Sequence, residues 1–338
     1  MIAAPVLDLG TAPALRASRE ATLALNARLS EALAAADFGP LHTLAAAGSL
    51  GRLEAGPDSD IDCLLVFGDH AMVAAAEQDA LVGRLMAIFA AHGLKLPKSA
   101  GIFRTPITPA VLCAPAALGS LDEAPAVFGK RMQVLLDARP LYAPEAFRAL
   151  RGAILDWYGT GFVAHGERAQ WTYLVNDLVR YLHSYAAWQQ YKFDRSADDG
   201  WYLRQAKLRG SRMVTFAGLL CLLGAASVRS DERRAWLEAA LNLTPLERIA
   251  LVMGTDDSAA FATLLAAYDR THALLADPDV RKALVAASPA GWQTLPARHA
   301  DEFAELHAAT GVVLTTLTNF VLSRRGIWAQ DFLNYLIF

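Results

Sequence analysis

Residues 48–67 constrain the fold of this chain more than any other stretch. They read Gly-Ser-Leu-Gly-Arg-Leu-Glu-Ala-Gly-Pro-Asp-Ser-Asp-Ile-Asp-Cys-Leu-Leu-Val-Phe, a Gly-Ser pair followed by a turn and then by Asp-x-Asp opening an apolar run. The apolar segment 41–47 before the pair predicts a first strand, and 60–67 predicts a second strand that is covered on both faces. The chain therefore has to build a unit of strand, tight turn and acidic strand.

The residue types in this unit indicate a chemistry. Successive side chains of a strand point to opposite faces, so Asp60 and Asp62 share one face and repel each other unless a cation lies between them. Magnesium prefers oxygen ligands and often keeps substrate phosphates as its other ligands. Gly48 lets backbone approach a phosphate, and Ser49 with the amides after it can donate hydrogen bonds to one. The stretch predicts a site for a metal ion and a nucleoside triphosphate.

Length and charge limit the number of domains and the kinds of partner that this chain can have. The 338 residues suggest two domains with ample chain for a core. A net charge of −3 and a pI near 6.2 give no overall attraction to nucleic acid or to an acidic membrane. We therefore expect neither partner, and the oligomeric state stays open.

The cysteines and apolar segments favour a cytoplasmic protein. Cys63, Cys113 and Cys221 lie far apart among apolar neighbours, which predicts core packing in a reducing compartment. The N-terminus has no basic start followed by an apolar segment. The uncharged run 213–228 is shorter than the roughly 20 residues that span a bilayer, so we expect a buried helix.

The first 143 residues read as a mixed domain. Apolar spacing predicts helices over 11–35 and 69–92, with a short helical turn at 51–55. Three prolines in 94–112 leave room only for short strand pieces near 102–105 and 107–112. Residues 115–130 read as loop and helix, and 132–142 as an apolar strand that ends at Pro140.

Helical periodicity dominates from Pro144 onward. We expect helices near 145–158, 167–193, 202–226, 231–241, 244–252, 257–274, 278–286, 298–307 and 309–323. The predicted fold class is α+β, with a small mixed sheet flanked by helices in residues 1–143 and an all-helical domain in residues 144–338.

A family resemblance rests on the opening stretch. Gly48-Ser49, ten further residues and Asp60-Ile61-Asp62 resemble the signature of the nucleotidyltransferase superfamily that includes DNA polymerase beta. The full stretch from Gly48 to Asp62 is most similar to the bacterial uridylyltransferase-like branch. The resemblance covers about residues 40–145 and is specific for the superfamily, but it does not indicate a substrate.

The resemblance implies a third carboxylate on a neighbouring strand, within an apolar-Asp-x-Arg pattern. Asp137-Ala138-Arg139 fits this pattern, whereas Asp122 and Glu123 lie in a loop or helix start. Three carboxylates could hold two Mg²⁺ ions, as in two-metal phosphoryl-transfer sites, with Asp137 completing the ion on the acceptor side and taking the proton. The alternative is that Asp137 only pairs with an arginine from a helix.

Ser49 would hold the leaving phosphates. Arg52 is either a further phosphate contact or the partner of Glu54 or Asp58 in an ion pair at the surface, and Ser59 is expected to cap the turn.

Two predicted helices add a basic face. Asn176, Arg180 and Ser184 share one face of the first, and the second carries a face made of Arg204, Lys207, Ser211 and Arg212, with Arg209 pointing elsewhere. The basic residues of these faces could line the catalytic cleft and neutralise the triphosphate or an anionic acceptor, because the guanidinium fork suits phosphate. They are Arg180, Arg204, Lys207 and Arg212. The alternative is an ordinary salt bridge between helices, of Asp177 with Arg180 or Arg204.

These features predict a Mg²⁺-dependent nucleotidyltransferase that moves a nucleoside monophosphate from a nucleoside triphosphate (NTP) to a hydroxyl of a small molecule or protein, releasing pyrophosphate. A nucleotide-binding sensor on the same fold, or an enzyme acting on RNA ends, remains an alternative. The base and the acceptor stay open.

Overall fold

A computed structural model describes residues 7–56, 59–69, 74–96, 105–159, 171–196, 200–229, 232–287 and 299–337, without the side chains of 190–196. The expected strand piece at 102–104 and the residue Asp58 lie outside these ranges. The chain divides into two compact units, which we call the sheet unit (residues 18–174) and the helical unit (residues 1–17 and 175–338). The two divisions fall within helices α1 (Pro13–Ala34) and α7 (Thr172–Ser196).

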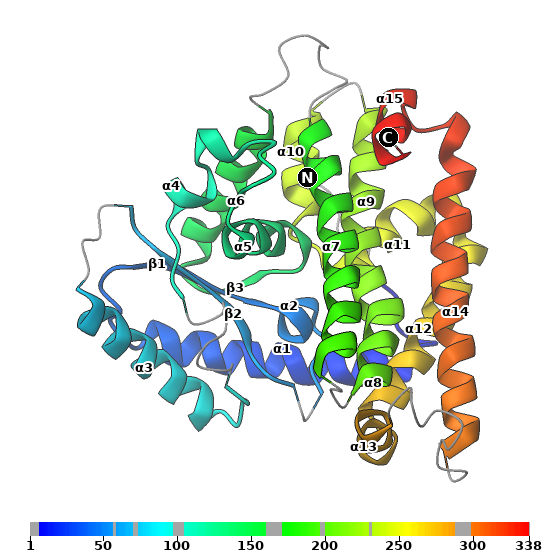
Figure 1. Cartoon of the computed structure of the whole chain (residues 1–338), viewed down its shortest axis with the longest axis horizontal. Coiled ribbons are helices and arrows are strands. Elements are labelled where there is room, and N and C mark those ends of the chain that lie inside the picture. The colour runs from blue at the N-terminus through cyan, green and yellow to red at the C-terminus, as the bar shows by residue number, and fades with distance from the viewer. Residues whose placement is uncertain are drawn as a thin grey trace. The chain divides into compact units, whose positions relative to one another are not determined.

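The sheet unit contains a three-stranded antiparallel sheet in the order β2-β1-β3 (Figure 1). Its strands are β1 (Leu41–Ala47), β2 (Asp62–Phe67) and β3 (Arg139–Tyr142). In β2, Asp62 is paired with Ala47, the last residue of β1. Two isolated parallel bridges, Asp60 to Lys95 and Val66 to Ile107, lie outside the named strands. The predicted strands 41–47 and 60–67 are confirmed, the second from Asp62 onward.

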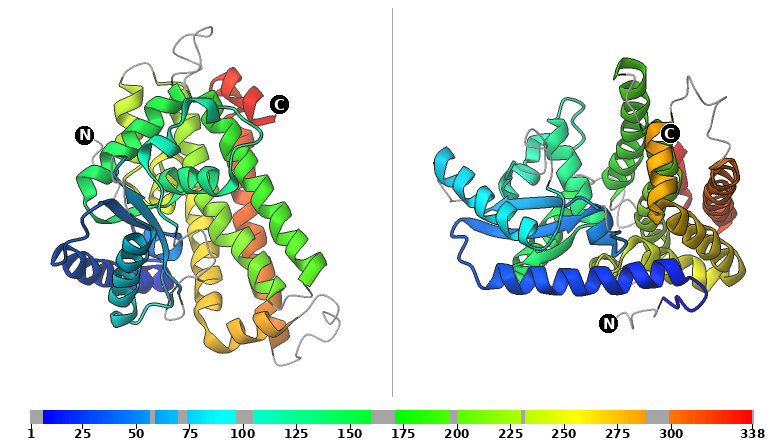
Figure 2. Two further views of the ribbon diagram at one scale, coloured as in Figure 1. Left: turned by 60° about the vertical axis from the view of Figure 1, so that its left-hand side comes forward. Right: turned by 90° about the horizontal axis from the view of Figure 1, so that it is seen from below.

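Helices cover both faces of this sheet, with α1 and α3 on one side and α5 and α6 on the other (Figures 1 and 2). The buried side chains of α1 and α3, among them Leu29, Leu33, Leu85 and Phe89, join one apolar cluster with strand residues. The helices of this unit are α1 (Pro13–Ala34), α2 (Gly48–Arg52), α3 (Ala75–Ala91), α4 (Pro109–Leu112), η2 (Pro115–Ala117), α5 (Pro125–Leu136) and α6 (Pro144–Gly159).

Two predicted strands in this unit are wrong over most of their length. Residues 109–112 form α4, because Thr108 caps the backbone N–H of Val111 and Pro109 occupies the first turn. Residues 132–136 are the end of α5, and Asp137 is its C-terminal cap residue. Only 139–142 pair as a strand, with Pro140 inside it. Within the described sheet β3 pairs with β1 alone, and such an edge position tolerates proline.

The helical unit begins within α7 (Thr172–Ser196) and contains helices only among its described residues. They are α8 (Trp201–Lys207), the π-helical turn η4 (Leu208–Arg212), α9 (Met213–Ser227), α10 (Arg233–Ala240), α11 (Pro245–Asp256), α12 (Ser258–Ala276), α13 (Pro278–Ala286), α14 (Ala300–Ser323), η7 (Arg324–Gly326) and α15 (Gln330–Ile337). The helical class of this half is confirmed, although 298–307 and 309–323 form the single helix α14, and α15 was not expected.

The predicted domain boundary at Pro144 does not coincide with the boundary between the two units. Helix α6 packs against β1 and β3 and belongs to the sheet unit. The apolar face of α6 covers that side of the sheet and buries Phe147, Leu150 and Ile154. Periodicity marks α6 as a helix but carries no information about which core it joins.

Helix α9 forms the core of the helical unit. Eleven of its residues are buried, and α11 packs along it while α12 packs along α14 (Figure 2). Two described stretches, 201–227 and 300–326, are long and apolar enough to cross a membrane on length and composition alone, a test that core helices of soluble proteins also pass. The expected burial of the run around α9 is observed within this unit.

Cysteine burial follows the sequence expectation in part. Cys63 and Cys221 are buried, and Cys113 is partly buried. Burial raises the pKa of the Cys221 thiol to about 12, so this side chain stays protonated.

Candidate functional site

Gly48 and Asp62 are in direct contact at the junction of β1 and α2. Gly48 has a φ of +63°, and a Cβ at this position would lie 2.6 Å from Oδ2 of Asp62. Only glycine fits both the left-handed backbone and the carboxylate beside it. The Gly-Ser turn therefore lies directly beside Asp62, although ten residues separate the turn from the Asp-x-Asp pair in the sequence.

A second glycine of the same turn fixes α2 against the end of α5. A Cβ at Gly51 would lie 2.1 Å from the carbonyl oxygen of Asp137 and 2.7 Å from that of Ala46. The backbone of α2 thus rests on the α5–β3 junction and on β1. The spacing of the two glycines in Gly-Ser-Leu-Gly is what brings the turn to both Asp62 and Asp137.

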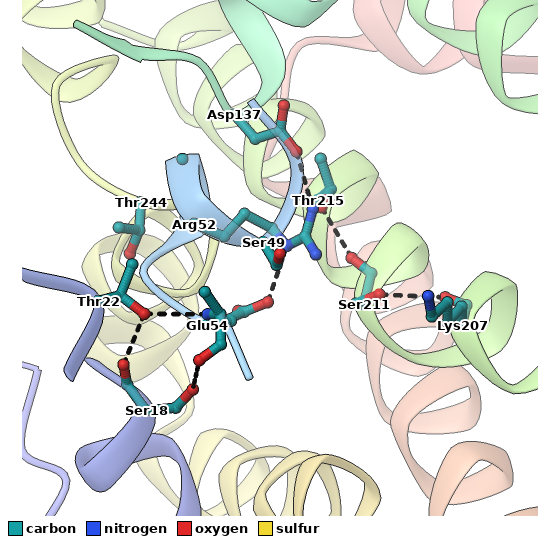
Figure 3. A network of polar contacts seen from close by, with 12 residues as sticks. Ser18, Thr22, Ser49, Arg52, Glu54, Asp137, Lys207, Ser211, Thr215 and Thr244 are labelled. Atoms are coloured by element: carbon teal, nitrogen blue, oxygen red, sulfur yellow. Dashed lines mark hydrogen bonds and ion pairs between the residues drawn. The ribbon is translucent and has the colours of Figure 1, made fainter. Parts of the chain in front are cut away.

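Arg52 bridges two acidic side chains in the interior of the sheet unit (Figure 3). Its Nη1 donates to Oδ2 of Asp137 at 2.9 Å, and its Nε donates to Oε2 of Glu54 at 2.7 Å. The three side chains are 6%, 3% and 7% exposed, respectively. The alternatives that paired Arg52 with Glu54 and Asp137 with a helix arginine are both observed, and the pairing is buried instead of on the surface.

Helix α1 braces the loop that follows α2. Thr22 Oγ1 accepts from the amide of Ala55 at 3.0 Å, and Ser18 Oγ donates to the carbonyl of Ala55 at 2.9 Å (Figure 3). Asn26 Nδ2 donates to the carbonyl of Leu50 in α2 at 3.3 Å. Sequence reasoning missed these residues. Their spacing at i, i+4 and i+8 on an apolar helix was the signal that could have found them.

The two serines of the motif contact each other. Ser49 Oγ donates to Ser59 Oγ at 3.1 Å, and Ser59 Oγ also accepts from the amide of Gly56 at 3.0 Å. The prediction that Ser59 caps the turn is confirmed. Two residues later, the amide of Ile61 donates to the carbonyl of Lys95 at 3.0 Å and holds the segment that carries Asp60.

The three predicted metal ligands do not converge as a group. Among the described residues, no set of three or more His, Cys, Asp or Glu side chains is placed to hold a metal ion. Asp137 is directed to Arg52 in the interior, whereas Asp60 is exposed and Asp62 is half-buried.

The competing acids are also engaged elsewhere. Glu123 pairs with the buried Arg131, and Asp122 accepts a hydrogen bond from Ser120. Neither therefore replaces Asp137 as a third ligand.

The donor chemistry of the remaining pair fits one divalent cation. Asp60 and Asp62 supply hard oxygen atoms, and the glycine at position 48 avoids the clash that a side chain there would make with Oδ2 of Asp62. Asp137 does not belong to this donor set in the structure.

A buried lysine lies in the same unit. Lys130 on α5 is 2% exposed, and its Nζ donates to the carbonyl of Thr105. Burial lowers the pKa of this ammonium to about 8. Nothing in the sequence pattern indicated this environment, because a single lysine in an amphipathic helix normally faces water.

The residues of the predicted basic faces lie in the helical unit. Arg180 lies 3.6 Å from Asp177 on the same helix, which is the ordinary salt bridge weighed as the alternative, here within α7. The guanidinium of Arg212 lies over the ring of Tyr185, 5.5 Å from its centroid, in a cation–π contact.

The other members of this face lie on α8 and η4. Ser211 Oγ donates to the carbonyl of Lys207 (Figure 3), and Arg204 is half-buried. That Arg180, Arg204, Lys207 and Arg212 bind phosphate stays a prediction.

Comparison of the chain with known protein families and with curated proteins finds no match to either.

Proposed function

We propose that the sheet unit binds a Mg²⁺–nucleoside triphosphate and transfers a nucleoside monophosphate to a hydroxyl acceptor. The observation that carries this proposal is the contact of Gly48 with Asp62, because it joins a glycine-serine turn to a carboxylate pair at the start of a strand. The glycine-serine turn would bind phosphate oxygens, and the carboxylate pair would bind a hard cation.

Within this proposal, Asp60 and Asp62 would hold one Mg²⁺, and the hydroxyl of Ser49 would exchange its hydrogen bond to Ser59 for one to a phosphate oxygen. The ion would neutralise charge on the triphosphate and polarise its α-phosphorus. Because Asp60 is exposed, the site is open to an acceptor from solvent. The acceptor oxygen forms a bond to the α-phosphorus, the bond to pyrophosphate breaks, and the hydroxyl proton passes to water.

Arg52, Glu54 and Asp137 act as positioning residues in this proposal. Their buried ion pairs tie α2 to the end of α5, and this connection fixes the turn that carries Ser49. We therefore leave Asp137 out of the metal ligands and do not assign it the proton.

One observation favours the non-enzymatic alternative. With Asp137 paired to Arg52, the described carboxylates do not supply the second metal site that two-metal transfer requires. A sensor that binds Mg²⁺ and a nucleotide without transferring it needs only Asp60 and Asp62.

Thermal-shift titration with α,β-methylene analogues of the four NTPs, each with Mg²⁺ or with EDTA, tests the binding step. We expect stabilisation by at least one analogue in Mg²⁺ only, since a ligand that binds the folded state raises the unfolding midpoint. Asp60→Asn and Asp62→Asn should abolish this shift. Asp79→Asn, an equal charge change on the exposed face of α3, should leave it intact. A shift that ignores both Mg²⁺ and the two site variants would contradict the proposal.

Pyrophosphate release over a panel of small-molecule and protein hydroxyl acceptors tests the transfer step. With an acceptor that supports release, the rate of pyrophosphate release should be at least ~10²-fold lower for Asp60→Asn than for the parent chain. Such a loss is expected when a main electrostatic group is removed from an active site. Mg²⁺-dependent binding with no release for any acceptor would instead support the sensor.

A further inference from the structure

The helical unit contains a cavity of about 680 Å³ between α8, η4, α13 and α14. Its volume falls within the range of small-molecule sites, which are typically about 300–1,000 Å³. The walls are largely apolar and aromatic, with Trp201 and Tyr202 from α8, Leu284 from α13, and Phe303 and Leu306 from α14. A site with such walls favours a ligand with a large apolar body.

A permanent positive charge lines this cavity. Arg209 of η4 is part of its wall, and the Nε atom of Arg209 is buried without a hydrogen-bond partner. Within the described part of the chain, no carboxylate, carbonyl or ring pairs with this guanidinium. A guanidinium stays charged at every physiological pH, and a partly buried charge without a partner is costly. An anion in the cavity would supply that partner.

Backbone geometry explains why Arg209 reaches the cavity. The π-helical turn of η4 carries Arg209 and Gly210, and π-helical turns often occur at functional sites. A Cβ at Gly210 would lie 3.0 Å from Cγ2 of Thr271, so η4 packs closely against α12. At Gly311 of α14, a Cβ would lie 3.8 Å from Nη2 of Arg209, so a residue without a side chain leaves room for the guanidinium.

We propose that this cavity binds an amphiphilic organic acid, with the apolar body against the aromatic wall and the acidic group paired with Arg209. The proposal concerns a second ligand site within the helical unit and does not rest on the proposed nucleotidyl transfer. His307, the other lining residue with an ionisable nitrogen, is exposed.

Fluorescence titration of the full chain with 8-anilinonaphthalene-1-sulfonate tests the site, followed by displacement with decanoate and with decan-1-ol. The two competitors share the alkyl chain and differ in the carboxylate. We expect saturable binding of the sulfonate and displacement by decanoate at a concentration at least ~10-fold lower than by decan-1-ol, in line with a charge-assisted hydrogen bond.

Two variants with matched controls locate the site. Arg209→Gln should weaken the sulfonate and decanoate by about 10-fold or more, while Arg325→Gln, the same change at an exposed arginine outside the cavity, should not. Ala304→Phe should narrow the cavity and weaken the binding of both probes, while Ala308→Phe, on the same helix away from the cavity wall, should not. Equal affinity for decanoate and decan-1-ol, or binding unchanged by both Arg209→Gln and Ala304→Phe, would overturn the proposal.

Discussion

Arg52 and Asp137 form a buried ion pair of 2.9 Å that connects α2 to the end of α5. Because Nε of the same guanidinium also contacts Glu54, one cation serves two carboxylates in the interior of the sheet unit. The sequence alone would assign Asp60, Asp62 and Asp137 to one metal site, but this ion pair gives Asp137 a different role from the other two. Asp137 is expected to control stability, whereas Asp60 and Asp62 are expected to control ligand binding.

Replacing Asp137 by Asn should therefore lower the free energy of unfolding. Breaking a buried ion pair by removing one charge typically costs about 3–5 kcal/mol, and the asparagine amide can keep part of the contact, so we expect about 2–4 kcal/mol. Urea denaturation of Asp137→Asn, Asp62→Asn and the parent chain measures the difference. Asp62→Asn, at a half-buried position, should change stability by less than about 1 kcal/mol. The opposite ranking of the two variants would contradict a structural role for Asp137.

Gly51 and Gly83 offer a contrast between a crowded glycine and a free one. Gly51→Ala would place Cβ 2.1 Å from a backbone oxygen of Asp137, which cannot move as a flexible side chain can, so we expect a loss of about 3 kcal/mol or more. Gly83 lies exposed within α3, and a Cβ added there would meet no atom within 4 Å, so Gly83→Ala should stabilise by about 0.5–1 kcal/mol. Thermal unfolding of both variants measures these changes: the unfolding midpoint should fall for Gly51→Ala and rise for Gly83→Ala. A Gly51→Ala chain as stable as the parent would refute the close approach of α2 to the α5–β3 junction.

Local patterns in the sequence predict some parts of this structure well. Strands β1 and β2, helix α1 and the helical second half follow from periodicity and from glycine and proline positions. Tertiary context decided the rest. Residues 132–136 are apolar enough for a strand, yet they continue the amphipathic face of α5. Which carboxylates share a site depends on Arg52, whose partner Asp137 lies 85 residues away in the chain.

Lys130 should make stability depend on pH in the alkaline range. The pKa of Lys130 is about 8 in the folded chain, whereas in the unfolded chain it has the ordinary value of 10.5. Between these two pH values the unfolded chain therefore binds more protons than the folded chain. The free energy of unfolding should therefore rise with pH from about 8 toward 10.5, and the cost of burying the ammonium applies in full below pH 8. Discounted for partial solvation, the rise should be about 1–2 kcal/mol.

The variant Lys130→Met isolates this contribution, because it removes the titrating group while keeping the buried stem. Urea midpoints of the parent chain and of Lys130→Met, measured from neutral pH to about pH 10, should converge as the pH increases. Parallel curves for the two chains would show that Lys130 keeps an ordinary pKa in the folded state.

Thr244 anchors the start of α11 through a capping box. Its Oγ1 accepts from the amide of Glu247, and Oε2 of Glu247 accepts from the amide of Thr244 at 2.7 Å. Thr244→Ala leaves a buried amide without its acceptor, so we expect a loss of about 1–2 kcal/mol in the free energy of unfolding.

Thr263→Ala is the matched control for the cap. Thr263 is exposed within α12, and its hydroxyl donates to the carbonyl of Ala259 one turn earlier. Its loss should be neutral or slightly stabilising, because alanine favours helix and the hydroxyl bond adds little there. Denaturation curves that shift equally for Thr244→Ala and Thr263→Ala would mean that the cap contributes nothing beyond ordinary helix propensity.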